Sequence, residues 1–387
     1  MIIPRVILSA IEKQLFIGTD KKPVVVIYGP RQVGKTTLAQ LILKKYPEQK
    51  AYFNCDFLDV QEVFSYANSH RLGGVVKDLK LIVLDEAQRI ENIGLVLKIL
   101  VDQHPHVQVI ATGSSSFDLS NKIKEPLTGR KSEFHLFPMS FEELYSKSNL
   151  LEQTRAIDTL LRFGSYPAVV GLGEEEAQKR LKEITGSYLF KDIFTFQDLK
   201  KPELLTKLLR LLAFQIGSEV SFHELAQQLG VDQTVIQRYV HLLEEAFVIF
   251  RLGAFKRNLR GEICKSRKIF FWDLGIRNTL IQNFNPLELR NDLGPLWENF
   301  CILERLKYLQ NHQLSANYYF WRTYTQKEID YIEESGGQLS AYEMKWNIGK
   351  KTKKPKAFLS AYKNSAFTVI NRKNVASFIM PETLHKK

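Results

Sequence analysis

A glycine-rich octet at residues 29–36 combines residue types that bind phosphate. Its sequence, Gly-Pro-Arg-Gln-Val-Gly-Lys-Thr, fits the phosphate-loop pattern G-x-x-x-x-G-K-S/T. An apolar run precedes the octet and apolar residues at helical spacing follow it, which is the strand–loop–helix context that the pattern requires. Gly29 and Gly34 let the backbone turn its N–H groups toward phosphate oxygens, and the helix that begins near Lys35 adds the positive end of its dipole. The octet therefore predicts a nucleotide site, and an ordinary glycine-rich turn is the alternative.

The side chains of this loop have distinct expected roles. Lys35 is expected to reach the β- and γ-phosphates, and the Thr36 hydroxyl is expected to ligate Mg²⁺. Arg31 either touches phosphate or packs outward. The residues expected to contact the nucleotide are Gly29, Pro30, Arg31, Gln32, Val33, Gly34, Lys35, Thr36 and Thr37.

Two carboxylates follow the apolar run 81–84. A buried parallel strand that ends in polar residues is typical of the sheet edge where a nucleotide binds. Asp85 at this edge is suited to hold the water shell of Mg²⁺, and Glu86 is suited to polarise the attacking water as a general base. An acidic loop after a core strand is the alternative, but the phosphate loop upstream favours the nucleotide interpretation.

A third apolar run, 107–112, ends in the polar stretch 113–116. A hydroxyl in this stretch is placed to touch the γ-phosphate or the attacking water, and a serine that caps a helix is the alternative. Apolar strands and helical segments alternate as far as about residue 140. This alternation predicts a doubly wound α/β domain.

These motifs resemble those of ATPases of the AAA+ superfamily. More narrowly, the chain is similar over essentially its whole length to prokaryotic predicted ATPases that join an AAA+ domain to a DUF4143-type C-terminal region. The stretches that carry the resemblance are residues 28–37, 84–88, 112–115, 127–130 and 163–167. The resemblance implies that Ser114 senses the γ-phosphate, that a helical lid follows the ATPase core, and that the protein forms a ring. It also makes Arg130 a candidate arginine finger that reaches into a neighbour's site, and a salt bridge within its own subunit is the alternative.

Residues 141–215 show the spacing of helices. The turn at 163–167, Phe-Gly-Ser-Tyr-Pro, places unusual demands on the backbone at its glycine and proline. Two roles for this turn stay open: it lines the nucleotide base, or it is a structural hinge.

Residues 216–284 have the pattern of a winged helix-turn-helix. A capping box opens a short helix, and a second helix with an apolar face follows after a turn. Two apolar stretches, 247–250 and 268–272, are candidate wing strands. On the exposed side of the second helix only Arg238 is surely cationic, so a structural or protein-contact role and direct DNA binding both stay open. The basic loop 256–260 offers a second place to hold a nucleic-acid backbone.

The last part of the chain, residues 285–387, holds a second set of residues suited to chemistry. Side chains two apart in a strand share a face, so Glu343 and Lys345 project together, and a paired strand would bring Asp330 beside them. Two carboxylates and one ammonium suit a divalent metal ion that activates water against a phosphodiester. The set resembles the PD-(D/E)XK nuclease core, which implies Asp330 and Glu343 as metal ligands, Lys345 as a catalytic residue and Glu298 as the acid of the preceding helix. An exposed hairpin with a cross-strand ion pair is the alternative.

The net charge of +12 is unevenly distributed over the 387 residues. Residues 251–387 contain 24 Lys and Arg against 12 Asp and Glu, whereas residues 1–250 contain 30 of each kind. A basic last third indicates a polyanionic partner, DNA first of all, and a solvated basic surface is the alternative. The sequence has no apolar stretch long enough to span a membrane and its three cysteines are far apart, so we expect a cytoplasmic protein without a membrane partner.

The sequence thus predicts an α/β protein with four parts: a P-loop AAA+ core at 1–140, a helical lid at 141–215, a winged helix-turn-helix at 216–284 and an α/β nuclease-like domain at 285–387. We expect it to bind and hydrolyse ATP with Mg²⁺, while its basic C-terminal region binds DNA and, as a further hypothesis, cleaves it with a metal. The alternative is an ATP-controlled switch that binds DNA or protein and whose nuclease-like domain is inactive. A small-molecule kinase is a third interpretation, against which the pair of carboxylates after the strand argues.

Overall fold

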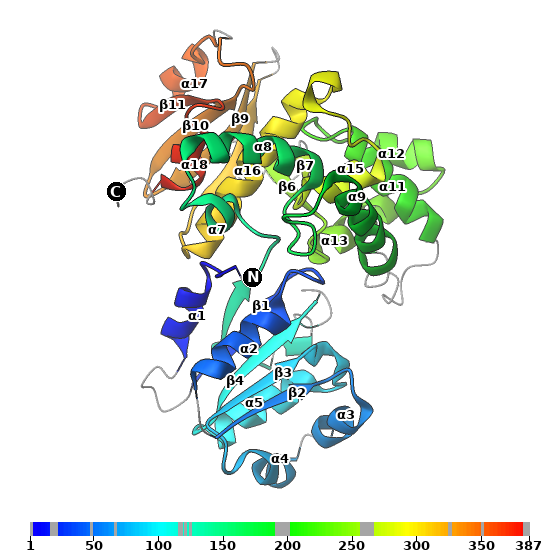
Figure 1. The fold of residues 1–387 in the computed structure, drawn as a ribbon, viewed down its shortest axis with the longest axis vertical. Coiled ribbons are helices and arrows are strands. Elements are labelled where there is room, and N and C mark those ends of the chain that lie inside the picture. Colours follow the sequence, from blue (N-terminus) through cyan, green and yellow to red (C-terminus); the bar gives the residue numbers. More distant parts are fainter. Residues whose placement is uncertain are drawn as a thin grey trace. The chain divides into compact units, whose positions relative to one another are not determined.

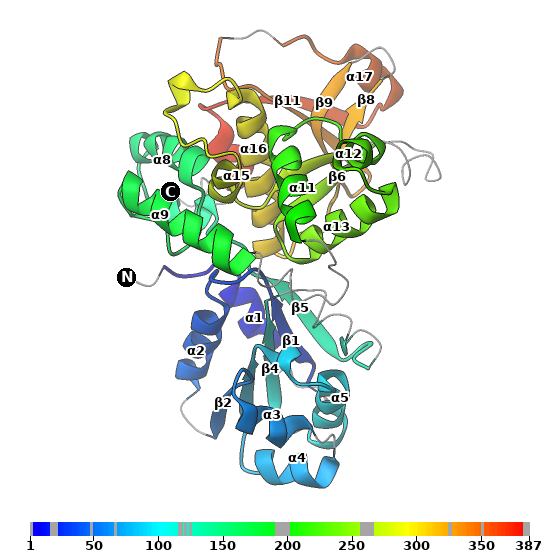
Figure 2. The ribbon, with the colours of Figure 1, turned by 90° about the vertical axis from the view of Figure 1, so that its right-hand side faces the viewer.

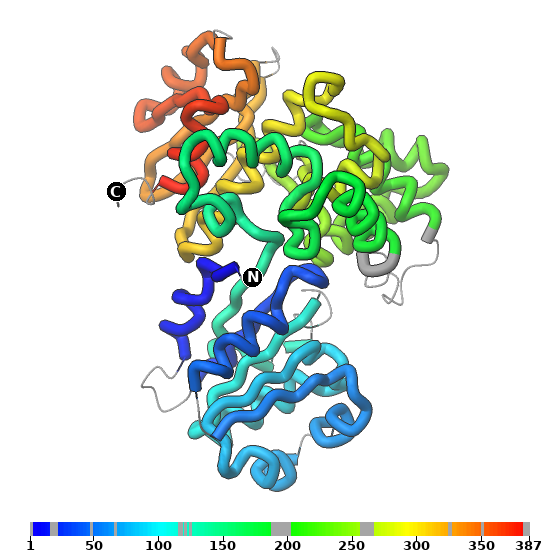
Figure 3. Tube along the Cα trace, in the orientation of Figure 1, coloured from blue at the N-terminus to red at the C-terminus, as the bar shows by residue number. Residues whose placement is uncertain are grey.

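A computed structural model describes most of the chain (Figures 1 and 3). The described residues are 3–15, 22–46, 49–65, 68–114, 119, 122–123, 126–189, 202–255, 267–323, 327–349 and 352–381. Ser115, Ser116 and the basic loop at 256–260 lie outside them. The chain divides into two units: unit 1 comprises residues 1–137 with 245–247, and unit 2 comprises residues 138–244 with 248–387.

Unit 1 is built on a five-stranded parallel sheet with the strand order β2-β3-β4-β1-β5. The strands are β1 (Val24–Tyr28), β2 (Lys50–Asn54), β3 (Leu81–Asp85), β4 (Gln108–Gly113) and β5 (Lys131–His135). Every residue of β1, β3 and β4 is buried, as expected for the centre of a parallel sheet. The α/β fold with a parallel sheet that the sequence indicated is therefore confirmed.

The helices of unit 1 cover this sheet. They are α1 (Leu8–Gln14), α2 (Lys35–Lys45), α3 (Leu58–Ser65), α4 (Ser69–Val76), the short η1 (Ala87–Arg89) and α5 (Ile93–Gln103). From β1 the chain crosses to β2 at one side of the sheet, and it then returns toward β1 through β3 and β4. Right-handed crossovers then place α2 on one face and α3 to α5 on the other (Figure 2). This winding brings the carboxyl ends of β1, β3 and β4 to a common edge.

Unit 2 contains a six-stranded mixed sheet with the order β11-β10-β9-β8-β6-β7. Its strands are β6 (Ile249–Ala254), β7 (Arg267–Phe271), β8 (Asn317–Arg322), β9 (Glu328–Ser335), β10 (Gln338–Met344) and β11 (Ser365–Ile370). The candidate wing strands correspond to β6 and β7, which pair with each other in antiparallel register. However, β6 also pairs in parallel with β8, at Gly253 with Tyr319. The sheet therefore joins strands from both sides of the boundary that the sequence suggested after residue 284.

Helices surround this sheet on the remaining length of unit 2. They are α7 (Phe141–Tyr145), α8 (Leu150–Phe163), α9 (Glu174–Glu183), η2 (Ile184–Leu189), α11 (Pro202–Phe214), α12 (Phe222–Leu229), α13 (Gln233–Glu245), α15 (Leu274–Leu280), η3 (Leu287–Leu289), α16 (Leu293–Asn311), α17 (Lys356–Ala361) and α18 (Val375–Ile379). Helix α16 is buried around most of its circumference and packs on β7, β10, α8, α15 and α18 (Figure 1). In the described part of the chain, no helix combines the length and the apolar character needed to cross a membrane.

The turn at 163–167 lies inside unit 2, against the start of α15. Gly164 has a left-handed backbone (φ +67°), and a Cβ atom at this position would lie 2.2 Å from Asp273 Oδ1. The next residue, Ser165, donates its N–H to Asp273 Oδ2 at 2.7 Å, while Asp273 Oδ1 accepts the N–H of Ile276 and so caps α15. Burial raises the pKa of Asp273 to about 6 despite these donors. Of the two roles left open for this turn, the contacts support the structural one.

Replacing Gly164 with alanine tests this role. Gly164→Ala adds a methyl group where Asp273 already lies, so we expect a loss of about 3 kcal/mol or more in the free energy of unfolding of unit 2. Gly171→Ala is the matched control, because Gly171 has φ +83° but no atom within 4 Å of its added Cβ. That variant should lose only about 1 kcal/mol, the cost of the left-handed backbone. Urea unfolding of both variants measures the difference, and equal losses would contradict the role of the Asp273 contact.

Candidate active sites

The loop between β1 and α2 has the backbone that the phosphate-loop pattern requires. A Cβ atom at Gly29 would lie 2.1 Å from Leu136 O, so a larger residue does not fit there. Gly34 has φ +99° and precedes the first residue of α2. The N–H groups of the first turn of α2 have no acceptor within the helix, and Thr36 and Thr37 in that turn are exposed. This arrangement leaves backbone donors and two hydroxyls at an open edge, where an anion can bind.

Two buried cations contact the carbonyl groups of this loop. Lys35 Nζ donates to Gly29 O at 2.8 Å and to Pro30 O at 3.0 Å. Arg5, which sequence reasoning missed, donates to Val33 O at 2.8 Å and to Phe137 O at 2.7 Å. The Arg5 side chain thus links the loop to the backbone at Phe137. A single arginine outside any motif gives no sequence signal for such a role.

The Asp85 carboxylate accepts hydrogen bonds from three hydroxyl groups at the edge of the sheet. Thr36 Oγ1 donates to Asp85 Oδ2 at 2.7 Å, Tyr52 OH donates to the same oxygen at 2.5 Å, and Thr112 Oγ1 donates to Oδ1 at 2.5 Å. The predicted pair of Thr36 and Asp85 therefore lies together. Tyr52 and Thr112 were missed, although their positions on β2 and β4, the strands that flank β3, could have indicated them. The adjacent hydroxyl and carboxylate oxygens are a donor set that suits Mg²⁺.

Glu86, Gln88 and Ser114 form a second hydrogen-bonded group beside Asp85. Gln88 Nε2 donates to Glu86 Oε2 at 2.6 Å and to Ser114 Oγ at 3.1 Å. Because an ionised carboxylate only accepts hydrogen bonds, the amide nitrogen of Gln88 is the atom that faces Glu86. Its oxygen, Oε1, is buried and has no hydrogen-bond partner among the described residues. Glu86 also has a left-handed backbone, with φ +55°. Gln88 therefore links the expected general base to the expected sensor, a role that the sequence motif did not assign.

Arg130 pairs within its own chain. Its Nε lies 3.0 Å from Asp102 Oδ1, and its Nη1 donates to Thr128 O at 3.3 Å. This is the salt bridge named above as the alternative to an arginine finger. A role in a neighbouring subunit's site stays a prediction.

The four residues predicted in the C-terminal part come together in unit 2. Asp330 lies on β9, Glu343 on β10 and Glu298 on α16, while Lys345 follows β10 and donates to Glu343 Oε1 at 2.5 Å. Burial raises the pKa of Glu298 to about 8, and the charge of Asp330 adds to the shift. Burial also raises the pKa of Asp330 to about 6, to which the charge of Glu343 contributes. The carboxylates are therefore close enough to disfavour one another's ionised forms.

A buried lysine, Lys268, completes this cluster. The sequence analysis assigned this residue to a candidate strand and gave it no role in a site. Lys268 on β7 donates to Glu298 Oε1 at 2.8 Å and forms a second, shorter ion pair with Glu328. Burial lowers the pKa of Lys268, but the charges of Glu298, Asp330 and Glu328 outweigh burial and the net shift is upward. Within the described ranges, no group of three or more His, Cys, Asp or Glu side chains is arranged to hold a metal ion. The nuclease resemblance implies only two carboxylate ligands, Asp330 and Glu343, so their role as metal ligands stays a prediction.

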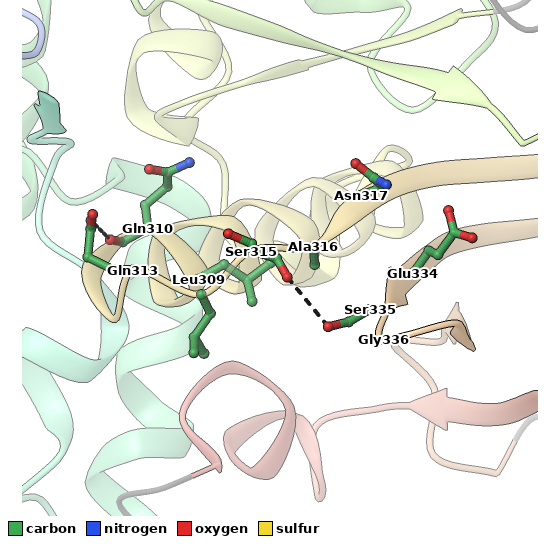
Figure 4. Close-up of a pocket in the computed structure, with 10 residues that line it drawn as sticks. Leu309, Gln310, Gln313, Ser315, Ala316, Asn317, Glu334, Ser335 and Gly336 are labelled. Atoms are coloured by element: carbon green, nitrogen blue, oxygen red, sulfur yellow. Dashed lines mark hydrogen bonds between the residues drawn. The ribbon is translucent and has the colours of Figure 1, made fainter. Parts of the chain in front are cut away.

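A separate cavity lies where α16 ends and the β9–β10 turn begins (Figure 4). Its lining residues are Leu309, Gln310, Gln313, Leu314, Ser315, Ala316, Asn317, Glu334, Ser335 and Gly336. Ser335 Oγ donates to Ser315 O at 3.4 Å across it, and Glu334 is its one charged residue (Figure 4). None of the residues of either candidate site lines this cavity.

Comparisons with known proteins find three family models that match parts of this chain. Residues 21–145 match the family model of an AAA domain, and residues 154–287 and 293–379 match two domains of unknown function, DUF8612 and DUF4143. A relative from Mycobacterium tuberculosis, the uncharacterized protein Rv2008c, is 31% identical over 334 residues, which span 84% of this chain and 70% of the relative. The chain belongs to the same family as Rv2008c. The AAA domain and the DUF4143 region that the motifs indicated are therefore confirmed.

Other similar proteins add no activity to this assignment. The uncharacterized protein MJ1544 of Methanocaldococcus jannaschii is 24% identical over 396 residues, which span 94% of this chain and 84% of that protein. Among solved structures, the Thermotoga maritima RuvB Holliday junction branch migration motor is 17% identical and covers 63% of this chain and 88% of its own, with a TM-score of 0.30. That score is too low for the likeness to inform the fold or the activity of this chain.

Removing one hydroxyl should reveal how much the Asp85 group stabilises unit 1. Thr112→Val keeps the shape of the side chain but removes the donor to Asp85 and the acceptor of the Glu86 N–H, which lies 3.1 Å from Thr112 Oγ1. We expect the free energy of unfolding of unit 1 to fall by about 2–3 kcal/mol, the cost of leaving buried polar groups unpaired. Thr37→Val, at an exposed position, should change it by less than about 0.5 kcal/mol. Denaturant unfolding distinguishes the two variants, and an unchanged stability of Thr112→Val would show that these contacts contribute nothing.

Proposed function

We propose that this protein binds ATP together with Mg²⁺ and hydrolyses it, and that unit 2 responds to the nucleotide state. The observation that carries the proposal is the Thr36–Asp85 hydrogen bond beside the phosphate-type loop. It combines anion-binding backbone donors with a hydroxyl and a carboxylate at one exposed sheet edge. The match of residues 21–145 to an AAA domain supports the same conclusion.

Each residue of the edge has a defined task in this proposal. The backbone N–H groups of the loop bind the phosphates, and the Lys35 ammonium exchanges its carbonyl partners for phosphate oxygens and stabilises the charge that develops on them. Thr36 and Asp85 would hold Mg²⁺, and the ion would neutralise phosphate charge when bound. The Glu86 carboxylate accepts a proton from the attacking water, and the Ser114 hydroxyl contacts the γ-phosphate.

Gln88 acts on this reaction through other residues. Its amide group holds the Glu86 carboxylate and the Ser114 hydroxyl at the same time, so it fixes the direction of the base relative to the sensor. The left-handed backbone at Glu86 supports this role, because such strain is often found where a side chain must be aimed. Gln88 is therefore a positioning residue in the proposed mechanism.

The partner that we propose for the C-terminal region is DNA, supported by the charge of its sequence. The excess of 12 positive charges lies entirely in residues 251–387. The two alternatives stated above are a DNA-cleaving enzyme and a switch whose nuclease-like domain is inactive. The switch is favoured, because Glu298 Oε1 already forms an ion pair with Lys268. The four-part division of the chain, a ring with Arg130 acting between subunits, and a cytoplasmic location stay predictions.

Substitutions at Lys35 and Glu86 test the proposal. Lys35→Ala should weaken ATP binding by about 100-fold or more, since it removes a charged contact to phosphate. Glu86→Gln should leave ATP affinity within about threefold of the wild-type value but lower the hydrolysis rate by about 10²–10⁴-fold, the range for loss of a general base. A fluorescent ATP analogue reports binding and released phosphate reports turnover. If the wild type does not bind ATP, the proposal is wrong; if Glu86→Gln hydrolyses ATP normally, only the assigned base is wrong.

A substitution at Gln88 tests its positioning role. Gln88→Leu removes a hydrogen bond to a charged group, so we expect kcat to fall by about 10–100-fold while the ATP dissociation constant changes by less than about threefold. Gln103→Leu, at the exposed end of α5, is the matched control and should leave both quantities unchanged. A weaker affinity with an unchanged kcat would contradict the assignment, because a positioning residue for the base acts on turnover.

A further inference from the structure

Lys268 lies at the meeting point of three elements of unit 2. The lysine comes from β7, and its two carboxylate partners, Glu298 and Glu328, come from α16 and from the start of β9. The Lys268 side chain is 2% exposed and that of Glu298 is 13% exposed, and the Lys268 ammonium lies 5.5 Å from the centre of the Phe320 ring. A charge buried to this extent requires an opposite charge beside it. The lysine and the two glutamates therefore depend on one another.

The other carboxylates of the cluster also have partners of their own. Asp330 Oδ2 accepts the N–H of Met344 at 2.7 Å, and Glu343 Oε1 accepts from Lys345. Glu328 has a second cation, Arg322, whose Nε lies 3.6 Å from Glu328 Oε2. Four carboxylates are thus distributed over two lysines, one arginine and one backbone amide.

This distribution differs from that of a metal site. A divalent cation of the Mg²⁺ or Mn²⁺ type needs several oxygen atoms that converge on one point at about 2.0–2.2 Å. Here Glu298, the acid contributed by the helix, is directed at Lys268, and Glu343 is directed at Lys345. Asp330 is held by the backbone of β10. One oxygen of each of these three carboxylates is thus bonded to a different partner, and none of these partners is a metal ion.

We propose that the Lys268 ammonium is the built-in cation of this cluster, that it takes the place of a divalent metal ion, and that unit 2 folds and acts without such an ion. The inference concerns unit 2 alone and does not depend on ATP hydrolysis in unit 1. It identifies the cluster as an internal ion network that joins β7, α16 and β9. It also gives a physical reason why a nuclease-like arrangement of acids need not cleave a phosphodiester.

The first test measures whether Lys268 and Glu298 are coupled. Lys268→Met should lower the melting temperature of the full chain by about 10 °C, because it leaves a buried carboxylate without its cation. Lys327→Met, which removes an exposed lysine next to Glu328, should change it by less than about 2 °C. Adding Glu298→Gln to Lys268→Met should recover at least half of the loss. Losses that simply add in the double variant would overturn the proposal.

The second test asks directly whether unit 2 holds a metal, and it does not require that Lys268→Met folds. Mn²⁺ is titrated by calorimetry into the nucleotide-free wild type and into Asp330→Asn, whose amide oxygen can still accept the Met344 N–H. We expect identical isotherms for the two proteins and an unchanged melting temperature after treatment with EDTA. Loss of one Mn²⁺ equivalent in Asp330→Asn, or a wild-type melting temperature that falls with EDTA and returns with Mn²⁺, would show a metal site and overturn the proposal.

Discussion

The need to pair buried charge shapes both units of this protein. An ionised group that leaves water without a partner costs several kcal/mol, so each buried charge determines which residues surround it. In unit 1, Asp85 collects three hydroxyl groups from two neighbouring strands and from helix α2. In unit 2, Lys268 brings together carboxylates from a helix and a strand, and Lys307 on α16 bonds to Glu304, Met139 O and Ser165 Oγ. Hydroxyl groups meet this requirement at Asp85, and carboxylates meet it at Lys268.

The kind of partner distinguishes the Asp85 edge of unit 1 from the Lys268 cluster of unit 2. The first can accept a charged ligand, whereas the second already contains its opposite charges. The Asp85 carboxylate accepts hydrogen bonds from three hydroxyl groups, and the Lys35 ammonium donates to two backbone carbonyls. Hydrogen bonds from neutral groups of this kind do not cancel a charge. A phosphate and its cation can therefore replace those partners and gain electrostatic energy. Around Lys268 the charges already oppose one another at ion-pair distance, and a further cation would first have to displace an ammonium. The open edge of unit 1 is exposed at Thr36, whereas the centre of the unit 2 cluster is buried.

Residues that belong to a motif could be predicted from the sequence, including the distant pair of Thr36 and Asp85, whereas long-range partners outside the motifs could not. The phosphate-type loop, the carboxylates at the end of β3 and the shared face of Glu343 and Lys345 all follow from spacing along a single segment. By contrast, Arg5 bonds to a carbonyl group 132 positions away, and Tyr52 reaches Asp85 only because β2 pairs with β3. No local pattern in the sequence indicated the pairing of β6 with β8 either. Because of this pairing, the two candidate wing strands, β6 and β7, are part of a larger sheet. Long-range partners are set by topology, which spacing alone does not encode.

The chain returns to unit 1 for one short segment between α13 and β6. Unit 1 includes the short segment 245–247, and in this segment the Phe247 ring lies 5.6 Å from the His135 ring and 6.0 Å from that of Phe137, at the end of β5. Helix α13 ends at Glu245, the first residue of this segment, and β6, which pairs with the strand that carries Lys268, begins at Ile249. Phe247 has a left-handed backbone (φ +56°), so the segment is held in a conformation that its packing must enforce. Because β5 pairs with β1, and Tyr28 lies opposite His135, the packing of Phe247 lies one strand away from the phosphate-type loop within unit 1.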